Sequence, residues 1–188
     1  MKRAIAVVVM MAAVAAGADE IKTLVDDTGS WRGSIKPEFK ITKIADETAE
    51  LVGIEVGPSM NRRLYLGVGA YGLVNDVDAG DAGKLNSFDL WYAGFMVDYT
   101  VLAGEVVHGS VGFLIGGGQL NVSDAPGSDS ASLFVFEPGV NLMMNMTKGI
   151  ELGVGASYRI MNGSDIYGFE NSDLSGPAAS LFVRWNEE

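Results

Sequence analysis

The sequence predicts an all-β fold, an eight-stranded antiparallel up-and-down β-barrel that spans a membrane. Three observations lead to this prediction. Eight stretches of about strand length alternate apolar with polar residues, their charges gather on the polar side, and the connections between them alternate between short and long. Because successive residues of a strand face opposite sides of a sheet, each stretch offers one face to hydrocarbon and one to a polar interior.

The alternation is plainest in three of the stretches. Residues 35–41 read IKPEFKI, residues 91–99 read WYAGFMVDY and residues 150–159 read IELGVGASYR. Strands of a transmembrane barrel have roughly 9–11 residues, with apolar side chains outward and polar ones inward. On this pattern the expected strands, in chain order, are residues 31–44, 48–57, 63–75, 88–100, 105–119, 131–145, 149–161 and 176–185.

The lengths of the connections give the orientation. Those after the second, fourth and sixth strands are short and are residues 58–62, 101–104 and 146–148. Those after the third, fifth and seventh strands are long and polar and are residues 76–87, 120–130 and 162–175. The first connection, around Asp46, is short although it lies on the side of the long ones. Outer-membrane barrels have short periplasmic turns and longer outer loops, so both chain ends are expected in the periplasm.

The N-terminus has the pattern of an export signal. Lys2 and Arg3 precede an apolar run, and an AGA tripeptide ending at Ala18 fits a signal-peptidase site. The apolar run is shorter than the roughly 20 residues that a membrane-spanning helix needs. The expected segments are a signal peptide at residues 1–18, cleaved near Ala18, a pre-barrel segment at residues 19–30 and an outer-membrane barrel at residues 31–188.

Composition excludes several classes of function. The chain has 13 Lys and Arg residues against 24 Asp and Glu residues, and its net charge is −11. Cleavage removes Lys2 and Arg3, which leaves 13 − 2 = 11 basic residues and a net charge of −13. Nucleic acid calls for clustered basic residues, so no nucleic-acid partner is expected. Without cysteine, the chain has no disulfide, zinc thiolate or cysteine nucleophile.

The nearest approach to a metal-binding motif is the acidic run DVDAGD at residues 76–81. It departs from the EF-hand loop, because Gly80 stands at the fifth position and Ser87 stands at the twelfth, where that loop needs a glutamate. The run is therefore interpreted as solvated loop acids. No metal site and no cofactor are predicted.

These features together resemble a known class. The chain is similar to the small eight-stranded outer-membrane barrel proteins, the broad class around the transmembrane domain of outer-membrane protein A. The resemblance rests on the signal, the eight strands, the alternating loop lengths and a last strand with Leu181, Val183 and Trp185. Two features depart from the C-terminal assembly signal of that class. Ser180 stands where the class usually has glycine, and three residues follow Trp185. The resemblance implies an outer-membrane location, contact with outer-membrane lipid, insertion by the barrel assembly machinery and a monomer.

The interior is expected to hold paired charges. An eight-stranded barrel is just wide enough for side chains to fill it, and a buried charge without a partner costs several kcal/mol. Folding the three hairpins about their short turns places acids beside bases. The predicted lumen charge network consists of Glu55 with Arg63, Asp98 with His108, and Glu137 a diagonal step from Arg159. A filled interior argues against a general porin, since open channels occur in barrels of about 16 strands.

The spacing of aromatic residues agrees with a strand that crosses a membrane. Trp91 and Tyr99 share a face eight residues apart, roughly 26 Å along a strand at about 3.3 Å per residue. A tilt of about 40° reduces this to near 20 Å, close to the roughly 25 Å apolar band that aromatic girdles flank. With Trp185 they are the predicted lipid-facing aromatic residues.

His108 and Ser110 form the one candidate catalytic pair. The spacing is similar to the His-x-Ser motif of the outer-membrane lipid A 3-O-deacylases, small barrels that also use a glutamate. The likeness stops at two residues, because the next acid after Ser110 is Asp124 and His108 is predicted to face the lumen. No catalytic residue is therefore predicted, and the chain is expected not to be an enzyme.

Three functions remain in order of preference. The first is an outer-membrane barrel with a structural or surface-interaction role and a side-chain-filled lumen. The second is a soluble periplasmic ligand-binding barrel of lipocalin type, which would place its apolar residues inward. The third and least favoured is a lipid A-modifying hydrolase.

Overall fold

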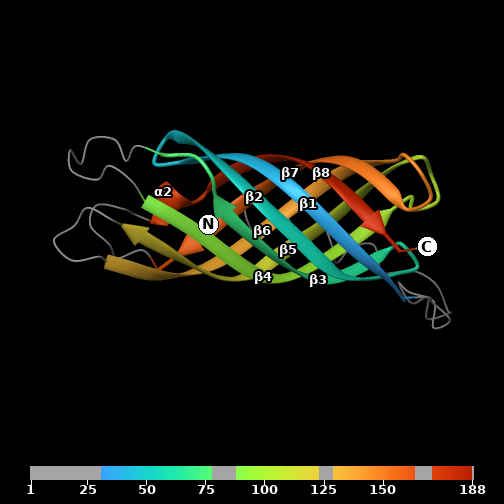
Figure 1. The fold of residues 1–188 in the computed structure, drawn as a ribbon, viewed down its shortest axis with the longest axis horizontal. Helices are drawn as coiled ribbons and strands as arrows, with labels where there is room; N and C mark the ends of the chain where they lie inside the picture. Colours follow the sequence, from blue (N-terminus) through green and yellow to red (C-terminus); the bar gives the residue numbers. More distant parts are fainter. Residues whose placement is uncertain (1–30, 78–87, 123–128, 164–170, 188) are drawn as a thin grey trace, which may run out of the picture.

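The eight strands close into one antiparallel barrel in which each strand pairs with its neighbours in chain order and β8 pairs with β1 (Figure 1). The structure is a computed structural model that describes residues 31–77, 88–122, 129–163 and 171–187. The elements are β1 (Trp31–Ile44), β2 (Glu47–Met60), β3 (Leu64–Leu73), β4 (Phe88–Val101), β5 (Val107–Val122), β6 (Asp129–Asn145), β7 (Ile150–Asn162), α2 (Asn171–Leu174) and β8 (Gly176–Asn186). The predicted fold class is confirmed. The predicted signal peptide and pre-barrel segment lie outside the described residues.

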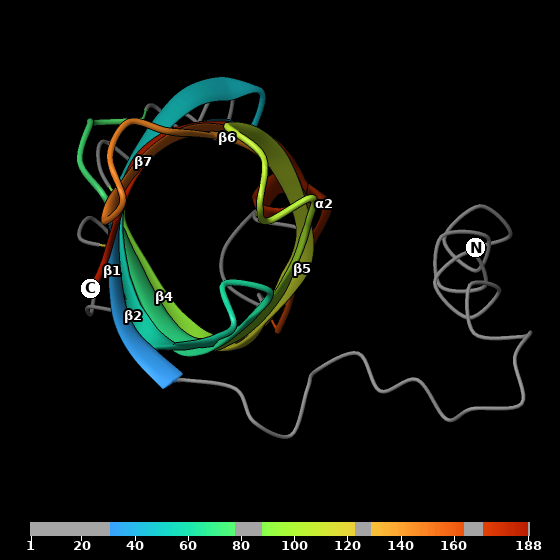
Figure 2. The ribbon, with the colours of Figure 1, turned by 90° about the vertical axis from the view of Figure 1, so that its right-hand side faces the viewer.

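The barrel has two different ends. The short turns, residues 61–63, 102–106 and 146–149, lie at one end, where Figure 2 looks into the barrel. We call it the turn end. The other end carries α2 and the two-residue connection between β1 and β2, and we call it the loop end. The start of β1 and the end of β8 both lie at the turn end (Figure 1).

Two turns lie later in the chain than the sequence predicts. Strand β2 continues past Pro58 to Met60, and its ladder with β3 breaks at the proline, between the pairs Val56↔Val68 and Ser59↔Tyr65. Proline cannot donate to a ladder, but at an interruption of this kind it does not end the strand. Strand β4 likewise continues to Val101. Both hairpins therefore have a register different from the predicted one.

The outer face carries the apolar side chains. Phe95 is 71% exposed, Val154 52% and Trp185 63%, and all three stand on the outward side of their strands. Among the described strand residues, three charged ones, Lys43, Glu50 and Asp89, depart from the expected pattern by facing outward. All three lie near the loop end of their strands. The apolar belt therefore lies between the two ends. No helix in the described ranges is long and apolar enough to cross a membrane.

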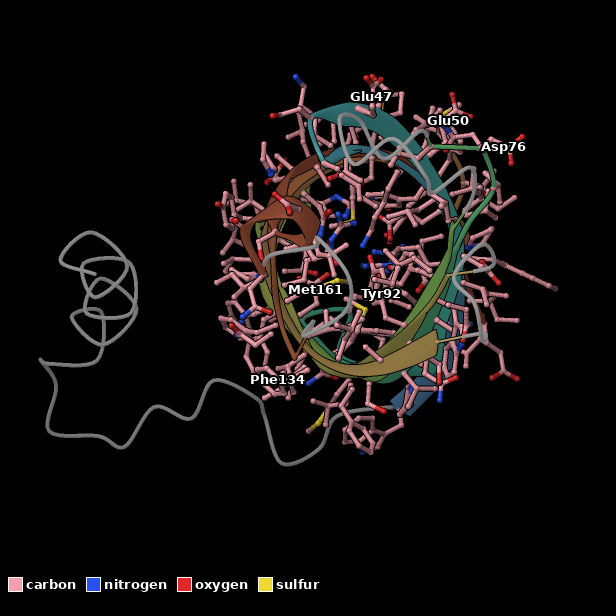
Figure 3. The ribbon with its side chains drawn as sticks, turned by 90° about the vertical axis from the view of Figure 1, so that its left-hand side faces the viewer. Glu47, Glu50, Asp76, Tyr92, Phe134 and Met161 are labelled. Atoms are coloured by element: carbon pink, nitrogen blue, oxygen red, sulfur yellow. The ribbon has the colours of Figure 1, made fainter. Side chains whose placement is uncertain are left out.

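The interior has an apolar part and a polar part. A buried apolar cluster fills the part toward the loop end and contains Ile44, Ala49, Leu51, Tyr71, Val77, Leu90, Tyr92, Leu114, Leu120, Ala131, Leu133, Val135, Met161 and Leu174. Figure 3 shows Tyr92 and Met161 inside the ring of strands, whereas Phe134 points away from it. Charged side chains occupy the middle and the turn end. The described side chains of the two parts of the interior are thus of opposite character.

Glycine provides room for the largest interior side chains. Gly53 on β2 stands directly opposite Tyr71 on β3. A Cβ atom built on Gly53 would overlap the Tyr71 ring. The absence of a side chain at this position therefore lets the ring turn inward, where its hydroxyl reaches the charges in the middle of the barrel.

Candidate functional site

The middle of the interior holds a lysine between two glutamates. Nζ of Lys36 lies 2.8 Å from Oε2 of Glu55 and 3.4 Å from Oε2 of Glu38. Strand alternation places all three inward, because Lys36 and Glu38 are two residues apart on β1 and Glu55 faces Lys36 across the β1–β2 ladder. All three side chains are buried. Ion pairs at this depth are strongly coupled, because neither partner can be replaced by water.

A second ion pair crosses the lumen at about the same level. Nζ of Lys40 on β1 lies 2.7 Å from Oε1 of Glu137 on β6. The same carboxylate accepts hydrogen bonds from the hydroxyl of Ser157 at 2.6 Å and from that of Tyr92 at 2.9 Å. Three donors serve one carboxylate, which is the arrangement that stabilises a buried negative charge.

Aromatic rings complete this layer. Tyr71 and Tyr92 stack with their centroids 5.1 Å apart. Nζ of Lys40 lies 3.6 Å from the centroid of the Tyr71 ring, and Nζ of Lys36 lies 4.6 Å from that of Phe182. Such cation–π contacts stabilise a desolvated ammonium group. Lysines, glutamates and aromatic rings therefore lie in contact at this level of the interior.

A third ion pair lies nearer the turn end. Nη2 of Arg184 lies 3.1 Å from Oδ2 of Asp98. Ser110 donates to the same oxygen at 3.0 Å, and Nδ2 of Asn141 donates to the Ser110 hydroxyl, also at 3.0 Å. The guanidinium also lies over the Tyr65 ring, with 5.4 Å between Cζ and the ring centroid.

The Glu151 carboxylate lies near several basic groups at the turn end. Nη2 of Arg62, in the turn after β2, lies 3.4 Å from its Oε1, and Nδ2 of Asn186 donates to Oε1 at 3.0 Å. Nε2 of His108 and Nη1 of Arg184 each lie 3.9 Å from its Oε2. The carboxylate therefore connects a turn, β5 and β8, and the charge network reaches the rim of the barrel.

Arg159 stands apart from the acids. Its side chain is fully buried near the loop end, where Nε donates to the carbonyl of Leu174 at 3.0 Å and Nη2 to that of Lys43 at 3.5 Å. Leu174 is the last residue of α2. The guanidinium thus fixes the short helix against the ends of β1 and β7.

A small cavity of about 40 Å³ lies among the charged residues of the interior, and its lining includes Lys36, Glu38, Asp98 and Asn141. A cavity needs about 10–15 Å³ to hold one water molecule, so this one has room for a few waters and for no larger solute.

The structure brings the six predicted network residues together only in part. It places Glu55, Asp98, His108, Glu137 and Arg159 inside the barrel, all of them buried. Arg63 lies in the turn after β2 and is exposed, so its predicted place in the lumen is wrong. Continuation of β2 past Pro58 places Glu55 opposite Gly69, and the cation beside Glu55 is Lys36.

The other two predicted pairings also differ from the structure. Asp98 stands opposite Gly112 because β4 continues to Val101, and its cation is Arg184 and not His108. The register of β6 and β7 is also shifted from the predicted diagonal step, since the pairs Phe136↔Ile160 and Gly139↔Ser157 place Glu137 directly opposite Arg159. The predicted ion pair between these two residues does not form, because Glu137 contacts Lys40 while Arg159 binds backbone carbonyls.

Sequence reasoning left the main bases out of the network. Lys36, Lys40 and Arg184 are the cations of its ion pairs, and Glu38 and Glu151 are further acids within it. The alternation of β1, β7 and β8 already places these residues inward. The signal was therefore present. Lys36 meets Glu55 within the β1–β2 hairpin, whereas Lys40 and Arg184 meet Glu137 and Asp98 from across the barrel, where hairpin register gives no information.

The candidate catalytic pair is part of this framework. The Ser110 hydroxyl donates to Asp98, and Nε2 of His108 lies 3.9 Å from Oε2 of Glu151. Both residues are buried inside the barrel, away from the apolar outer face. In the part of the chain that the structure describes, no group of three or more His, Cys, Asp or Glu residues is placed to hold a metal ion.

The predicted lipid-facing aromatic residues lie on the outer side of the barrel. Trp91 is 44% exposed and Trp185 is 63% exposed. Tyr99 is half-buried at the position opposite Leu64, on the outward side of β4. Trp91 and Tyr99 stand near opposite ends of their strand, at the two borders of the apolar belt.

The fold is that of solved outer-membrane barrels. The crystal structure of Neisserial surface protein A (NspA) is 13% identical, with a TM-score of 0.62 over 85% of this chain and 99% of that one. The N-terminal β-barrel domain of Pseudomonas aeruginosa OprF is 15% identical, with a TM-score of 0.55 over 84% and 100%. Ail, the attachment invasion locus protein of Yersinia pestis, is 13% identical, with a TM-score of 0.52 over 85% and 99%.

These likenesses confirm, at the level of fold, the resemblance to small eight-stranded outer-membrane barrels. No protein-family model matches the chain, and no curated protein matches its sequence.

Proposed function

We propose that this protein is an outer-membrane β-barrel with a structural or surface-interaction role and a closed interior. The observation that carries the proposal is the division of its side chains. Apolar residues such as Phe95 and Val154 face outward, while ion pairs such as Lys40–Glu137 fill the inside. In hydrocarbon every backbone polar group needs an internal partner, and a closed barrel supplies one for each strand.

The same division supports a membrane protein over a soluble ligand-binding barrel. A lipocalin-type barrel holds its ligand in an apolar interior and presents polar side chains to water. Here an exposed apolar belt would be left in water, and large exposed apolar surfaces mark sites of membrane or protein contact. The interior cavity of about 40 Å³ offers no space for a lipocalin ligand.

The proposal places the turn end in the periplasm and the loop end at the cell surface. The described turns at one end have three to five residues, whereas the strand ends at the other, where α2 lies, are joined by longer stretches of sequence, with 14 residues between Leu73 and Phe88. Export would follow from the predicted signal peptide, cleaved near Ala18, and insertion from the barrel assembly machinery acting on the last strand. Leu181, Val183 and Trp185 on β8 all face outward, as such a signal requires. We propose a monomer.

A surface role is supported by what the structural neighbours are named for. NspA is a surface protein, and Ail is an attachment protein that has also been crystallised with the heparin analogue sucrose octasulfate. For this chain we propose that the connections at the loop end are the contact surface. The proposal assigns no catalytic residue, because Ser110 is engaged by Asp98 and Asn141 within the framework.

The experiment combines fractionation with a permeability measurement. Expressed in a Gram-negative host, the protein should be found in the outer membrane and require detergent for extraction. Reconstituted in liposomes, it should not admit small sugars, and a general porin measured in parallel provides the positive control. Recovery in the soluble periplasmic fraction would support the lipocalin-type alternative, and rapid sugar entry would contradict the closed interior.

A further inference from the structure

The hydroxyl of Tyr71 lies between two carboxyl groups. Its oxygen is 2.6 Å from Oε2 of Glu38 and 2.5 Å from Oε1 of Glu55. Both separations are within the range of O–H···O hydrogen bonds and at its short end. Tyr71 is 3% exposed, Glu38 is 6% exposed and Glu55 is 1% exposed, so bulk water does not separate them.

The number of protons at this point does not match the number of hydrogen bonds. A tyrosine hydroxyl has one hydrogen to donate, whereas an ionised carboxylate only accepts. Tyr71 can therefore donate to Glu38 or to Glu55, but not to both. The second short contact needs a hydrogen of its own, and the carboxyl group on that side is the one group that can carry it. Without this hydrogen, two oxygen atoms would face each other with lone pairs only.

The charges lead to the same result. Lys36 is the cation of both glutamates, at 2.8 Å from Glu55 and 3.4 Å from Glu38. Within the described residues no other ion pair involves either glutamate. One lysine balances one carboxylate, and a second buried carboxylate beside it would be an uncompensated like charge.

The other interior acids lack this mismatch. Glu137 receives hydrogen bonds from Lys40, Ser157 and Tyr92, each of which has a hydrogen to give. Asp98 and Glu151 each have their own arginine and an additional donor side chain. In these three acids every hydrogen bond has a donor with a hydrogen to give, although Oδ1 of Asp98 and Oε2 of Glu151 accept none.

We propose that Glu38 and Glu55 hold one proton between them, with Tyr71 as the bridge, so that the middle of the barrel is a binding site for a single proton. One carboxylic acid donates to the Tyr71 oxygen, and Tyr71 donates to the remaining carboxylate. Lys36 then balances that carboxylate, and the cluster of four side chains is neutral. The inference goes beyond the proposed membrane role and does not depend on it.

Charged and titratable groups surround this site from several strands. On β1, Nζ of Lys40 lies over the Tyr71 ring. On β4, Tyr92 stacks on Tyr71 and Asp98 lines the same cavity as both glutamates. Glu137 of β6 lines that cavity too, paired with Lys40, while Arg184 of β8 pairs with Asp98. Each of these acids has a base of its own, which leaves the Glu38–Glu55 pair as the place where a proton is required.

The test is carbon NMR of the folded protein, reconstituted at neutral pH with glutamate labelled at its side-chain carboxyl carbon. One resonance should have the chemical shift of a protonated carboxylic acid, and the others should be carboxylates. The conservative variants E38Q and E55Q should each remove that resonance, because an amide supplies the missing donor without a proton. The matched control E137Q should leave it in place.

Two results would overturn the proposal. A wild-type spectrum with carboxylate shifts only would mean that the two contacts do not share a proton. A protonated resonance that survives in both E38Q and E55Q would place the proton elsewhere. Should one variant fail to fold, the wild-type spectrum and the other variant still decide the question.

Discussion

Nζ of Lys40 on β1 lies 2.7 Å from Oε1 of Glu137 on β6, although these strands are not neighbours in the barrel. The pair therefore joins parts of the wall that no backbone ladder connects. Its free energy should be visible in the stability of the whole barrel. The same contact explains why Glu137 has no ion pair with Arg159, which stands opposite it in the register of β6 and β7.

The first prediction concerns the coupling across the lumen. Lys40→Met and Glu137→Leu should each lower the free energy of unfolding by about 3–5 kcal/mol, because each leaves a buried charge without its partner. The double variant should recover much of this loss. A double-mutant cycle, measured by urea unfolding in lipid vesicles, gives the coupling energy. The control is the cycle of Glu137→Leu with Arg159→Met, which should be closer to additive. A larger coupling in the control cycle would contradict the structure.

The second prediction tests which face meets lipid. Val154→Arg, in the outward belt of β7, should cost about 2–4 kcal/mol, because the charge enters hydrocarbon near the bilayer midplane. Thr48→Arg, also outward but at the loop end of β2, should cost about 0–1 kcal/mol. Both values come from refolding into lipid vesicles. Equal costs would mean that the belt is not where the exposed apolar side chains place it.

The third prediction concerns Arg159 and the loop end. Arg159→Met removes the donors to the carbonyls of Leu174 and Lys43, so α2 should loosen from β1 while the barrel stays folded. Hydrogen exchange should become faster at Ala45, whose amide donates to the carbonyl of Asp173 at 2.9 Å. Arg63→Met, the same substitution at an exposed turn, should leave that exchange rate unchanged. Slow exchange in both variants would show that Arg159 does not fix the helix.

The fourth prediction concerns topology and uses the absence of cysteine. Glu47→Cys places a single thiol at the rim of the loop end, where Figure 3 shows Glu47, and Lys148→Cys places one in an exposed turn. On intact cells a membrane-impermeant maleimide should label the first variant. It should label the second only after the outer membrane is permeabilised. The opposite order would reverse the proposed orientation.

Local alternation was enough to predict the strands and their faces. The pattern IKPEFKI at residues 35–41 places Lys36, Glu38 and Lys40 inward, and all three are buried in the structure. It could not predict the turns after β2 and β4 with the same accuracy. Pro58 looks like the end of a strand, yet β2 continues past it because the ladder to β3 breaks there and resumes. A shift of two or three residues at a turn was enough to place Arg63 outside the lumen.

The sequence by itself determined the number of strands, the side of the sheet that each residue faces and the apolar character of the outer surface. All of these follow from the two-residue period of a strand and from residues close together in the chain. Lys36 and Glu55 meet within the β1–β2 hairpin, but the tertiary structure alone decided which charges meet across the barrel. Lys40 reaches Glu137 over 97 positions and Arg184 reaches Asp98 over 86, because closing the barrel brings distant strands around one narrow interior. A buried charge pairs with the nearest opposite charge, and for these two pairs the closure of the sheet, and not the turn of a hairpin, sets which charge is nearest.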